Sequence, residues 1–390
     1  MHYKQRCAME KRKIGKTGIE ATVIGLGGEH LDNQPYEVVE ETIHAALKQG
    51  INIMDLFMPG EAVRQNIGKA LDGNRDRMLI QGHIGSVDLK EQYDVSRDPE
   101  ICKKYFENLL RDLHTDYIDF GMLFFIDSEA AFDTVFNGEI LKYAQKLKRD
   151  GTIRAIGTGS HNPSIAAKVV ESGVIDLLLF SINPAFDMTP SEHNVLDTFD
   201  TETAFRVQDF AGIRPDRLAL YKLCESQSVS ITVMKTLGAG KLLSAEQTPF
   251  AQPLTVCQCI HYALTRPAVA SALIGCKSRE QVLKAARYTT LSDEERDYTD
   301  ALRSFQSFAG NCVYCGHCAP CPSAIDIAAV NKYLDIAVLD EVVPPSILQH
   351  YQSLSSHGSD CIACGSCEER CPFGVSIIEN MKKAAKVFGV

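Results

Sequence analysis

The sequence lacks any long uninterrupted apolar stretch. No run reaches the roughly 18–20 apolar residues that a membrane-spanning helix needs, so we expect no membrane span. Residues 1–13 are polar and basic without an apolar core, so we also expect no secretory signal and a cytoplasmic protein. The chain has no excess of positive charge either, since its net charge is −10. This balance argues against non-specific binding to nucleic acid.

Cysteine, in contrast, is abundant and unevenly placed. Of the 14 cysteines, eight follow Gly310 in two tight groups and six are scattered. A disulfide scaffold is typical of short secreted chains with spread cysteines. For a chain of 390 residues without an export signal, metal binding in a reducing compartment is the better explanation.

The two groups have the spacing of iron–sulfur ligands. They read Cys312-x-x-Cys315-x-x-Cys318-x-x-Cys321-Pro322 and Cys361-x-x-Cys364-x-x-Cys367-x-x-x-Cys371-Pro372. The second matches the bacterial two-cluster ferredoxin run, in which three thiolates bind one cluster and the fourth binds the other; the first is one residue shorter. Structural zinc is the alternative, but a trailing Cys-Pro has no evident use there. We therefore assign one [4Fe–4S] cluster to Cys312, Cys315, Cys318 and Cys371, and the other to Cys361, Cys364, Cys367 and Cys321.

Before these groups, short apolar runs alternate with segments of helical periodicity. Strands are predicted at 22–26, 51–54, 77–80, 117–123, 153–156, 175–180, 230–234 and 271–274. Apolar strands that alternate with amphipathic helices indicate βαβ units with a buried parallel sheet. Eight such units fit a (β/α)8 barrel. A doubly wound sheet is the alternative, but residues 25–28 lack the glycine-rich phosphate turn in the right frame.

The predicted fold class is therefore α/β, with two domains. A (β/α)8 TIM barrel spans residues 11–290, and a small α-helical ferredoxin-like iron–sulfur domain spans residues 291–390. In the second domain, helices are expected over 293–308, 328–351 and 377–387. Residues 14–19 read as a small hairpin that closes the bottom of the barrel. Residues 187–215 form a long polar loop, which we expect over the face where barrel active sites lie.

Several segments of the predicted barrel resemble the aldo/keto reductase family. The resembling segments are Ile14–Ile19 with Val23–Gly27, Gly50–Asp55, Asn66–Leu71, Tyr117–Asp119, Ile153–Gly157, and Val233–Lys235 with Gly240–Leu242. They span about residues 11–290, and the tail resembles the ferredoxin-like extension of one branch of that family. The resemblance implies a barrel fold and hydride exchange between NADPH and a carbonyl or alcohol.

The resemblance also implies a catalytic tetrad of Asp, Tyr, Lys and His, and the sequence departs from it. Asp55 matches the aspartate. Gly60 stands at the position of the tyrosine, residues 81–83 at that of the lysine, and residues 123–125 at that of the histidine. One of the tetrad members is present, so the residues argue against ordinary carbonyl reduction by that mechanism.

Other polar residues follow the predicted strands, at the end of the barrel where active sites lie. We predict His83 as a general acid and Asp55 as the group that orients it, because a histidine titrates near neutral pH. The remaining strand-end residues are His30, Asp127, His161, Asn183 and Lys235. His30 and His161 complete the catalytic candidates. The alternatives for these histidines are ordinary packing or surface roles, or a metal site with Asp55, which no short-range spacing supports.

The segment after the eighth predicted strand is similar to the loop with which aldo/keto reductases bind the 2′-phosphate of NADPH. Lys277, Ser278 and Arg279 stand there, at the start of a predicted helix. The resemblance further assigns Ser160 and Asn183 to the nicotinamide amide and adds Lys235 to the cofactor site. NADP(H) is therefore the predicted nicotinamide cofactor. The alternative is that residues 277–279 are only a solvated helix start.

Together these features predict an iron–sulfur oxidoreductase. The leading hypothesis is NADP(H)-linked reduction of a small organic, carbonyl-type substrate, with electron transfer through two [4Fe–4S] clusters. The expected electron partner is a ferredoxin-type or flavodoxin-type carrier. One alternative is a reductase fed by the clusters without nicotinamide. The other is an electron-transfer protein whose barrel is not catalytic.

Overall fold

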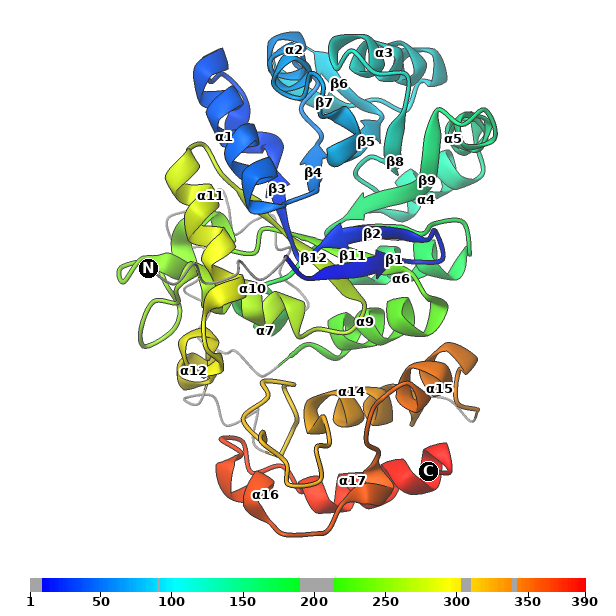
Figure 1. Ribbon diagram of the computed structural model, residues 1–390. Helices are drawn as coiled ribbons and strands as arrows, with labels where there is room; N and C mark the ends of the chain where they lie inside the picture. Colours follow the sequence, from blue (N-terminus) through cyan, green and yellow to red (C-terminus); the bar gives the residue numbers. More distant parts are fainter. Residues whose placement is uncertain (1–8, 90–91, 190–212, 303–309, 339–341) are drawn as a thin grey trace. The chain divides into compact units, whose positions relative to one another are not determined.

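The structure is a computed structural model that describes residues 9–89, 92–189, 213–302, 310–338 and 342–390 (Figure 1). The chain divides into two compact units. The first comprises residues 1–182, 229–237 and 269–291, and the second comprises residues 183–228, 238–268 and 292–390. Beyond residue 182 the chain passes repeatedly between them, so each unit combines segments that are distant in sequence.

Eight parallel strands in the first unit close into a barrel, in the order β10-β11-β12-β3-β4-β5-β8-β9. Pairing of β12 with β3 completes the ring. The closed ring confirms the predicted eight-stranded barrel and excludes the doubly wound alternative. The strands are β3 (Ile24–Gly27), β4 (Ile53–Leu56), β5 (Leu79–Ile84), β8 (Ile118–Leu123), β9 (Ile153–Ser160), β10 (Leu177–Ser181), β11 (Ser230–Met234) and β12 (Val269–Gly275).

An antiparallel hairpin of β1 (Lys11–Ile14) and β2 (Ile19–Thr22) precedes the barrel. Ile14 and Ile19 are buried in one apolar cluster with Ile53, Leu79 and Phe120 of the barrel strands. These three barrel residues lie in the first halves of their strands, so the hairpin covers the amino-terminal end of the ring. The predicted hairpin and its place at the barrel bottom are thereby confirmed.

Amphipathic helices surround the strands of this unit, as Figure 1 shows for the first of them. They begin with clear local signals: Asp98, for example, accepts hydrogen bonds from the backbone N–H groups of Glu100 and Ile101. A further hairpin, which the sequence did not predict, follows β5. The helices are α1 (Tyr36–Gln49), α2 (Glu61–Ala70), α3 (Pro99–Asp112), α4 (Glu129–Phe136), α5 (Glu139–Arg149), α6 (Pro163–Glu171) and α11 (Arg279–Ala286), with η1 (Gly28–Leu31), η2 (Arg75–Arg77) and η4 (Arg287–Thr290); the hairpin is β6 (Ser86–Leu89) and β7 (Gln92–Val95).

The regular secondary structure of the second unit, in its described residues, is helical. The helix predicted over 377–387 is confirmed, whereas the one predicted over 328–351 is two helices separated at Pro344. The helix predicted over 293–308 is two short turns, and its last residues lie outside the described part. The helices are α7 (Pro184–Met188), α9 (Pro215–Gln227), η3 (Gly238–Leu243), α10 (Val256–Leu264), α12 (Asp293–Arg296), α13 (Thr299–Leu302), α14 (Ile327–Ala337), α15 (Pro345–Gln352), η6 (Gly358–Asp360), α16 (Ser366–Arg370) and α17 (Ile377–Phe388).

A buried charge cluster joins α7, α9 and α10. Asp187 Oδ1 accepts hydrogen bonds from Arg217 Nε at 2.8 Å and from the Tyr221 hydroxyl at 2.5 Å. Its Oδ2 accepts one from the Tyr262 hydroxyl at 2.8 Å. A buried carboxylate is tolerated when it is paired and hydrogen-bonded in this way. Asp187 is therefore part of a packed helix rather than the start of the predicted polar loop, of which residues 190–212 lie outside the described part.

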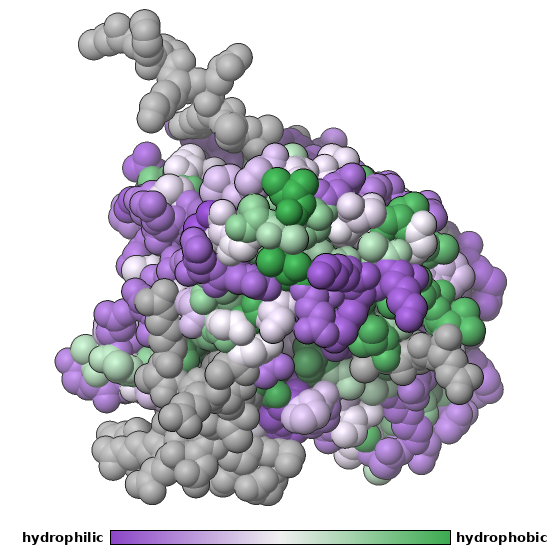
Figure 2. All heavy atoms as spheres, turned by 90° about the horizontal axis from the view of Figure 1, so that it is seen from below, coloured by the Kyte–Doolittle hydropathy of each residue, from purple (hydrophilic) through white to green (hydrophobic). Residues whose placement is uncertain are grey.

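The viewed surface in Figure 2 mixes apolar and hydrophilic side chains in small groups. Among the described residues, the most exposed large apolar side chains are those of Val342, Ile362 and Val338, all in the second unit. No helix in the described ranges combines the length and the apolar character that crossing a membrane requires.

Candidate functional site

Two residues predicted to act together, Asp55 and His83, are in direct contact. Asp55 lies near the carboxyl end of β4 and His83 near that of the neighbouring β5. His83 Nε2 and Asp55 Oδ1 are 2.8 Å apart. Both residues are buried: 2% of the surface of His83 and 7% of that of Asp55 are exposed. A carboxylate at this distance holds the orientation and the tautomer of the imidazole ring.

Aromatic rings enclose the imidazole of His83. Phe57 and Phe124 present ring edges to it, with centroid distances of 6.3 and 5.2 Å. Tyr93 of the second hairpin packs on Phe57 at 5.4 Å. His83 Nδ1 is buried and has no hydrogen-bond partner among the described residues. Since an unpaired buried polar atom is costly, this nitrogen is the one that a bound molecule can satisfy.

Asp127, after β8, is the centre of a second polar network. Its Oδ2 lies 2.8 Å from His161 Nδ1. Its Oδ1 accepts hydrogen bonds from the Ser160 hydroxyl at 2.8 Å and from the His161 backbone N–H at 2.6 Å. Burial alone would raise the pKa of Asp127, but the hydrogen bonds and charge of His161 outweigh it and lower that pKa. The Asp127 carboxylate is thus held ionised, and the Ser160 hydroxyl predicted for nicotinamide is engaged with it.

Aromatic contacts connect the two histidine networks. Phe125 packs on His161 at a centroid distance of 5.2 Å and on Phe124 at 5.9 Å. Phe124 in turn contacts His83. His83 and His161 therefore belong to one end of the barrel, separated by two phenylalanine rings that stand where the family histidine was expected.

Lys235 and His30 lie at strand ends of the same unit. Lys235 follows β11 in a left-handed backbone conformation, with φ 61°. Burial lowers its pKa, against the opposing charges of Glu29 and Asp127. His30 is exposed and lies against Gly275, where an added Cβ would approach its ring to 2.3 Å. Lys235 thus shares the electrostatic environment of Asp127, whereas His30 packs on the end of β12.

The three residues predicted for the 2′-phosphate begin α11. Lys277 and Arg279 are exposed. The Ser278 hydroxyl accepts a hydrogen bond from Gln281 N–H, and the Lys277 N–H donates to Gln281 Oε1 at 2.8 Å. Asn183, predicted for the nicotinamide amide, begins α7 and accepts a hydrogen bond from Phe186 N–H. The cationic side chains of Lys277 and Arg279 face solvent, whereas the polar groups beside them already have protein partners.

The first predicted cysteine set is gathered in the second unit. The thiols of Cys315 and Cys318 each lie within electrostatic range of Cys371, and Cys312 within range of both. Burial raises the pKa of Cys312, Cys315 and Cys318, while backbone N–H groups of Tyr314 and His317 bond the sulfurs of Cys312 and Cys315. N–H groups directed at sulfur are typical of sites that bind iron–sulfur clusters.

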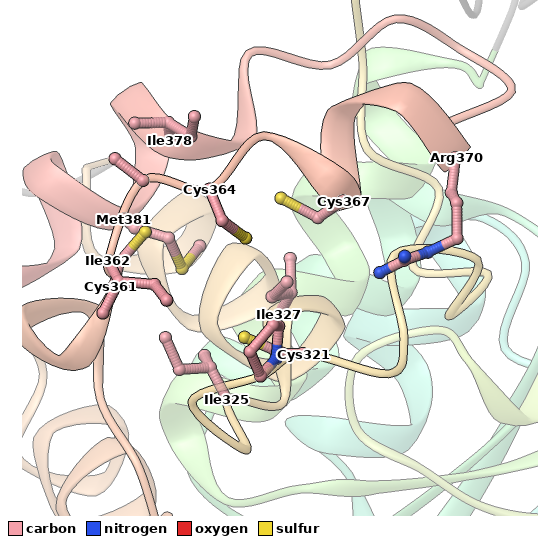
Figure 3. A pocket seen from close by; sticks show the side chains of 12 residues that line it. Cys321, Ile325, Ile327, Cys361, Ile362, Cys364, Cys367, Arg370, Ile378 and Met381 are labelled. Atoms are coloured by element: carbon pink, nitrogen blue, oxygen red, sulfur yellow. The ribbon is translucent and has the colours of Figure 1, made fainter.

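The second set lines a small hollow that is partly open to solvent. Figure 3 shows the sulfur atoms of Cys321, Cys364 and Cys367 directed into the space between them. The hollow is lined by Cys321, Cys361, Cys364 and Cys367, together with apolar residues such as Ile325 and Met381. Cys321 of the first motif thus joins the triplet of the second, which is the crossed pairing expected from the sequence.

The two cysteine loops repeat one backbone pattern. Tyr314 and Gly316 in the first loop, and Ala363 and Gly365 in the second, have positive φ angles between 54° and 85°. These left-handed residues curl each loop around its sulfurs. A helix follows each loop, and α14 and α17 are joined by a hydrogen bond of 2.7 Å between the side chains of Asn331 and Asn380.

The described cysteines do not form a site for a single metal ion. Across the described ranges, no three His, Cys, Asp or Glu side chains are close enough to share one metal ion. A four-cysteine zinc site requires its sulfurs at about 2.3 Å from one ion. The same observation counts against a metal site made by His30, His83, His161 and Asp55.

One residue near the first cysteine loop escaped the sequence analysis. Arg266 Nη2 donates a hydrogen bond to the carbonyl of Val313, next to Cys312. The Tyr298 hydroxyl donates to the same carbonyl at 3.0 Å. Arg266 precedes a proline after an apolar helix, which reads as an ordinary helix end, so only the tertiary structure reveals its position.

Known proteins resemble the barrel part of this chain. The model of the aldo/keto reductase family matches residues 23–255. An uncharacterized oxidoreductase of Bacillus subtilis, YqkF, is 24% identical, over 79% of this chain and 99% of that protein. The aldo-keto reductase YhdN of the same organism is 32% identical, over 39% of this chain and 47% of that protein.

Solved structures show the same fold. Aldo-keto reductase AKR11C1 from Bacillus halodurans superposes with a TM-score of 0.57 at 22% identity, over 74% of this chain and 94% of that one. The glycerol dehydrogenase AKR11B4 from Gluconobacter oxydans superposes with a TM-score of 0.55 at 19% identity, over 76% and 96%. The family match covers more than half of the chain and ends before the cysteine groups. The chain is therefore an oxidoreductase that belongs to the aldo/keto reductase family.

Proposed function

We propose that this protein is an iron–sulfur oxidoreductase. It reduces a small organic, carbonyl-type substrate with NADP(H) at the carboxyl end of the barrel strands. Two [4Fe–4S] clusters in the second unit exchange single electrons with a ferredoxin-type or flavodoxin-type carrier. The observation on which this proposal rests is the hollow lined by Cys321, Cys361, Cys364 and Cys367.

The eight cysteines would hold the clusters in the crossed arrangement. Cys312, Cys315, Cys318 and Cys371 form one set, and Cys361, Cys364, Cys367 and Cys321 the other. When bound, such clusters supply or accept one electron each. The protein contributes buried thiols, N–H groups directed at sulfur and apolar lining residues, all of which favour a cluster over hydrated iron.

In the barrel, His83 and Asp55 form the acid–base pair. Asp55 binds Nε2 and thereby fixes the orientation of the ring, so that Nδ1 exchanges the proton with substrate. Phe57 and Phe124 exclude water around this nitrogen and offer apolar surfaces to an organic molecule. His161 shares this barrel end and, with Asp127 and Lys235, adds charged groups that can orient a polar substrate. His30 is the least supported catalytic candidate, because it is exposed and lies against Gly275.

The nicotinamide site rests on fewer contacts. Lys277 and Arg279 would bind the 2′-phosphate, and Ser278, Ser160, Asn183 and Lys235 complete the predicted cofactor residues. When bound, NADPH supplies a hydride. The exposed cations at the start of α11 support this assignment.

A nicotinamide-independent reductase is the second candidate. The Ser160 hydroxyl is engaged with Asp127, and Ser278 caps α11. Both hydroxyls would have to give up protein partners to bind a cofactor. In this alternative, the electrons for the substrate come from the external carrier through the clusters, and the barrel supplies the protons.

An anaerobic titration separates the candidates. Holoprotein is titrated with NADPH while nicotinamide fluorescence and the visible absorption of the clusters are recorded, with NADH as the control. We expect saturable binding of NADPH that is tighter than that of NADH, accompanied by bleaching of the clusters. Absence of binding would leave the nicotinamide-independent candidate, and binding without bleaching would show that the two centres are not coupled. Purified protein without iron and sulfide would overturn the proposal.

A further inference from the structure

Arg266 is a buried cation that forms no ion pair with a described residue. Only 2% of its surface is exposed, and the carboxylate that acts on it, that of Asp187, does so from beyond ion-pair distance and is itself paired with Arg217. Nη2 donates hydrogen bonds to Thr265 Oγ1 at 3.0 Å, to the Tyr298 hydroxyl at 3.2 Å and to the Val313 carbonyl. Nε and Nη1 have no hydrogen-bond partner in the described part of the chain. Arg217, the buried arginine of the same unit, differs because it is paired with Asp187.

The side chain is held against the first cysteine loop. The carbonyl that it bonds belongs to Val313, between Cys312 and Tyr314. Its guanidinium carbon lies 4.5 Å from the ring centre of Tyr262 and 5.5 Å from that of Tyr314. All of these residues belong to the second unit, so their arrangement does not depend on how the two units are placed.

A buried guanidinium without a counter-charge is unfavourable unless something supplies the negative charge. Four thiolates outweigh the positive charge of an oxidised [4Fe–4S] core, and reduction adds one more negative charge. The potential of such a cluster depends on nearby charge and on its exposure to solvent. A buried cation beside the cluster therefore stabilises its reduced form.

The second cysteine set lies in different surroundings. Cys364 is exposed, and Arg370, which influences it, is an exposed side chain that bonds the carbonyls of Cys318 and Pro320. Water and salt screen an exposed cation much more than a buried one. Near the first set, the Asp335 carboxylate acts on Cys312 with the sign opposite to that of Arg266, and it accepts a hydrogen bond from the Tyr314 hydroxyl.

We propose that Arg266 is the counter-charge of the cluster held by Cys312, Cys315, Cys318 and Cys371, and that it keeps the reduction potential of this cluster above that of the other. This inference rests on the proposed function. Arg266 acts through the cluster and is a positioning residue, not a catalytic one. An external one-electron carrier delivers an electron to the cluster of the second cysteine set. Because the cluster of the first set has the higher potential, the electron then passes on to it.

The test is a potentiometric titration of anaerobic holoprotein, monitored by electron paramagnetic resonance. Wild-type protein is expected to reduce in two separate one-electron steps. In Arg266→Met, the reduction potential of the higher-potential cluster should decrease. At the wild-type midpoint potential of that cluster, its ratio of reduced to oxidised form should therefore fall at least tenfold. Arg266→Lys, which retains a charge, should lie in between. Lys383→Gln, which removes an exposed cation of α17 paired with Glu379, is the control, and should change either ratio less than about twofold.

A second measurement does not depend on the arginine variants. In Cys364→Ser, the remaining intact cluster should have the higher of the two wild-type potentials, and in Cys315→Ser the lower. The reverse assignment, or one common potential for both wild-type clusters, would overturn the proposal. So would an Arg266→Met protein with full iron content and unchanged potentials. Protein that binds no cluster at all would instead contradict the proposed function, and the two failures are therefore distinguishable.

Discussion

The barrel and the cysteine region of this chain differ in how many of the functional residues expected of them they contain. The barrel keeps the complete family fold, with eight strands in a closed ring, but one of the four expected catalytic side chains. The cysteine region lies outside the family match, and four of its cysteines, Cys321, Cys361, Cys364 and Cys367, line one hollow. A fold depends on many distributed apolar residues, whereas chemistry depends on a few side chains. Membership of a family therefore establishes the barrel without establishing its reaction.

The largest expected effect concerns the cysteine region. Cys364→Ser and Cys315→Ser should each lose about half of the roughly eight iron atoms that two filled clusters contain, because each variant removes one ligand of one cluster. The measurement is iron and sulfide analysis of protein purified without oxygen. Cys102→Ala is the matched control, since Cys102 is a buried barrel cysteine and should leave the iron content unchanged. Equal iron content in all three variants would break the comparison between the regions.

The next effect concerns the barrel. His83→Gln should slow substrate turnover by roughly 10²–10⁴-fold, because it removes the proposed proton donor. Asp55→Asn should have a smaller effect, since it alters the orientation of the ring and leaves the imidazole in place. Turnover is followed with NADPH and a panel of small aldehydes and ketones. His44→Gln on α1, an exposed histidine whose ring bonds the Ala70 carbonyl, is the control. Full activity in His83→Gln would mean that the barrel uses other residues.

A third prediction tests whether the residues that begin α11 recognise the 2′-phosphate of NADPH. Lys277→Ala should weaken NADPH binding about tenfold while leaving NADH binding nearly unchanged, because only NADPH has the 2′-phosphate. Arg279→Ala should act in the same direction. Fluorescence titration measures both affinities. Lys284→Ala, an exposed cation later in the same helix, serves as the control. An equal loss of affinity for both cofactors would indicate a general effect on α11 rather than recognition of the phosphate.

A last prediction concerns the stability of the second unit. Burial, reinforced by the charge of Arg296, lowers the pKa of His261 to about 4. A histidine with a lowered pKa in the folded state contributes stability above its unfolded pKa near 6.5, and this stability is lost as pH falls toward 4. We expect a loss on the order of 2 kcal/mol between pH 7 and pH 5. His261→Leu should flatten this part of the unfolding curve, and an unchanged slope would assign it to other groups.

The sequence alone determined the parts of this protein that follow from local pattern. Alternating apolar runs predicted the eight strands, and residues 14–19 predicted the hairpin, because both features depend on residues that are close in the sequence. Cysteine spacing likewise predicted that Cys321 lies with the second triplet, and Cys321 lines one hollow with Cys361, Cys364 and Cys367; the binding of clusters by these cysteines stays a prediction. The order of polar residues at strand ends pointed to Asp55 and His83, since neighbouring parallel strands end at the same edge.

Only the tertiary structure decided the features that depend on contacts between distant residues. Asp127 became the centre of a network, and Phe57 and Phe124 the walls around His83, because the barrel closes and brings separate strand ends together. The helix predicted to begin at Asp293 is two short turns, since helix ends depend on packing as well as on periodicity. Arg266 looked like an ordinary helix end in the sequence. Its burial beside the first cysteine loop is a property of the packed unit, because the two segments are 47 residues apart in the chain.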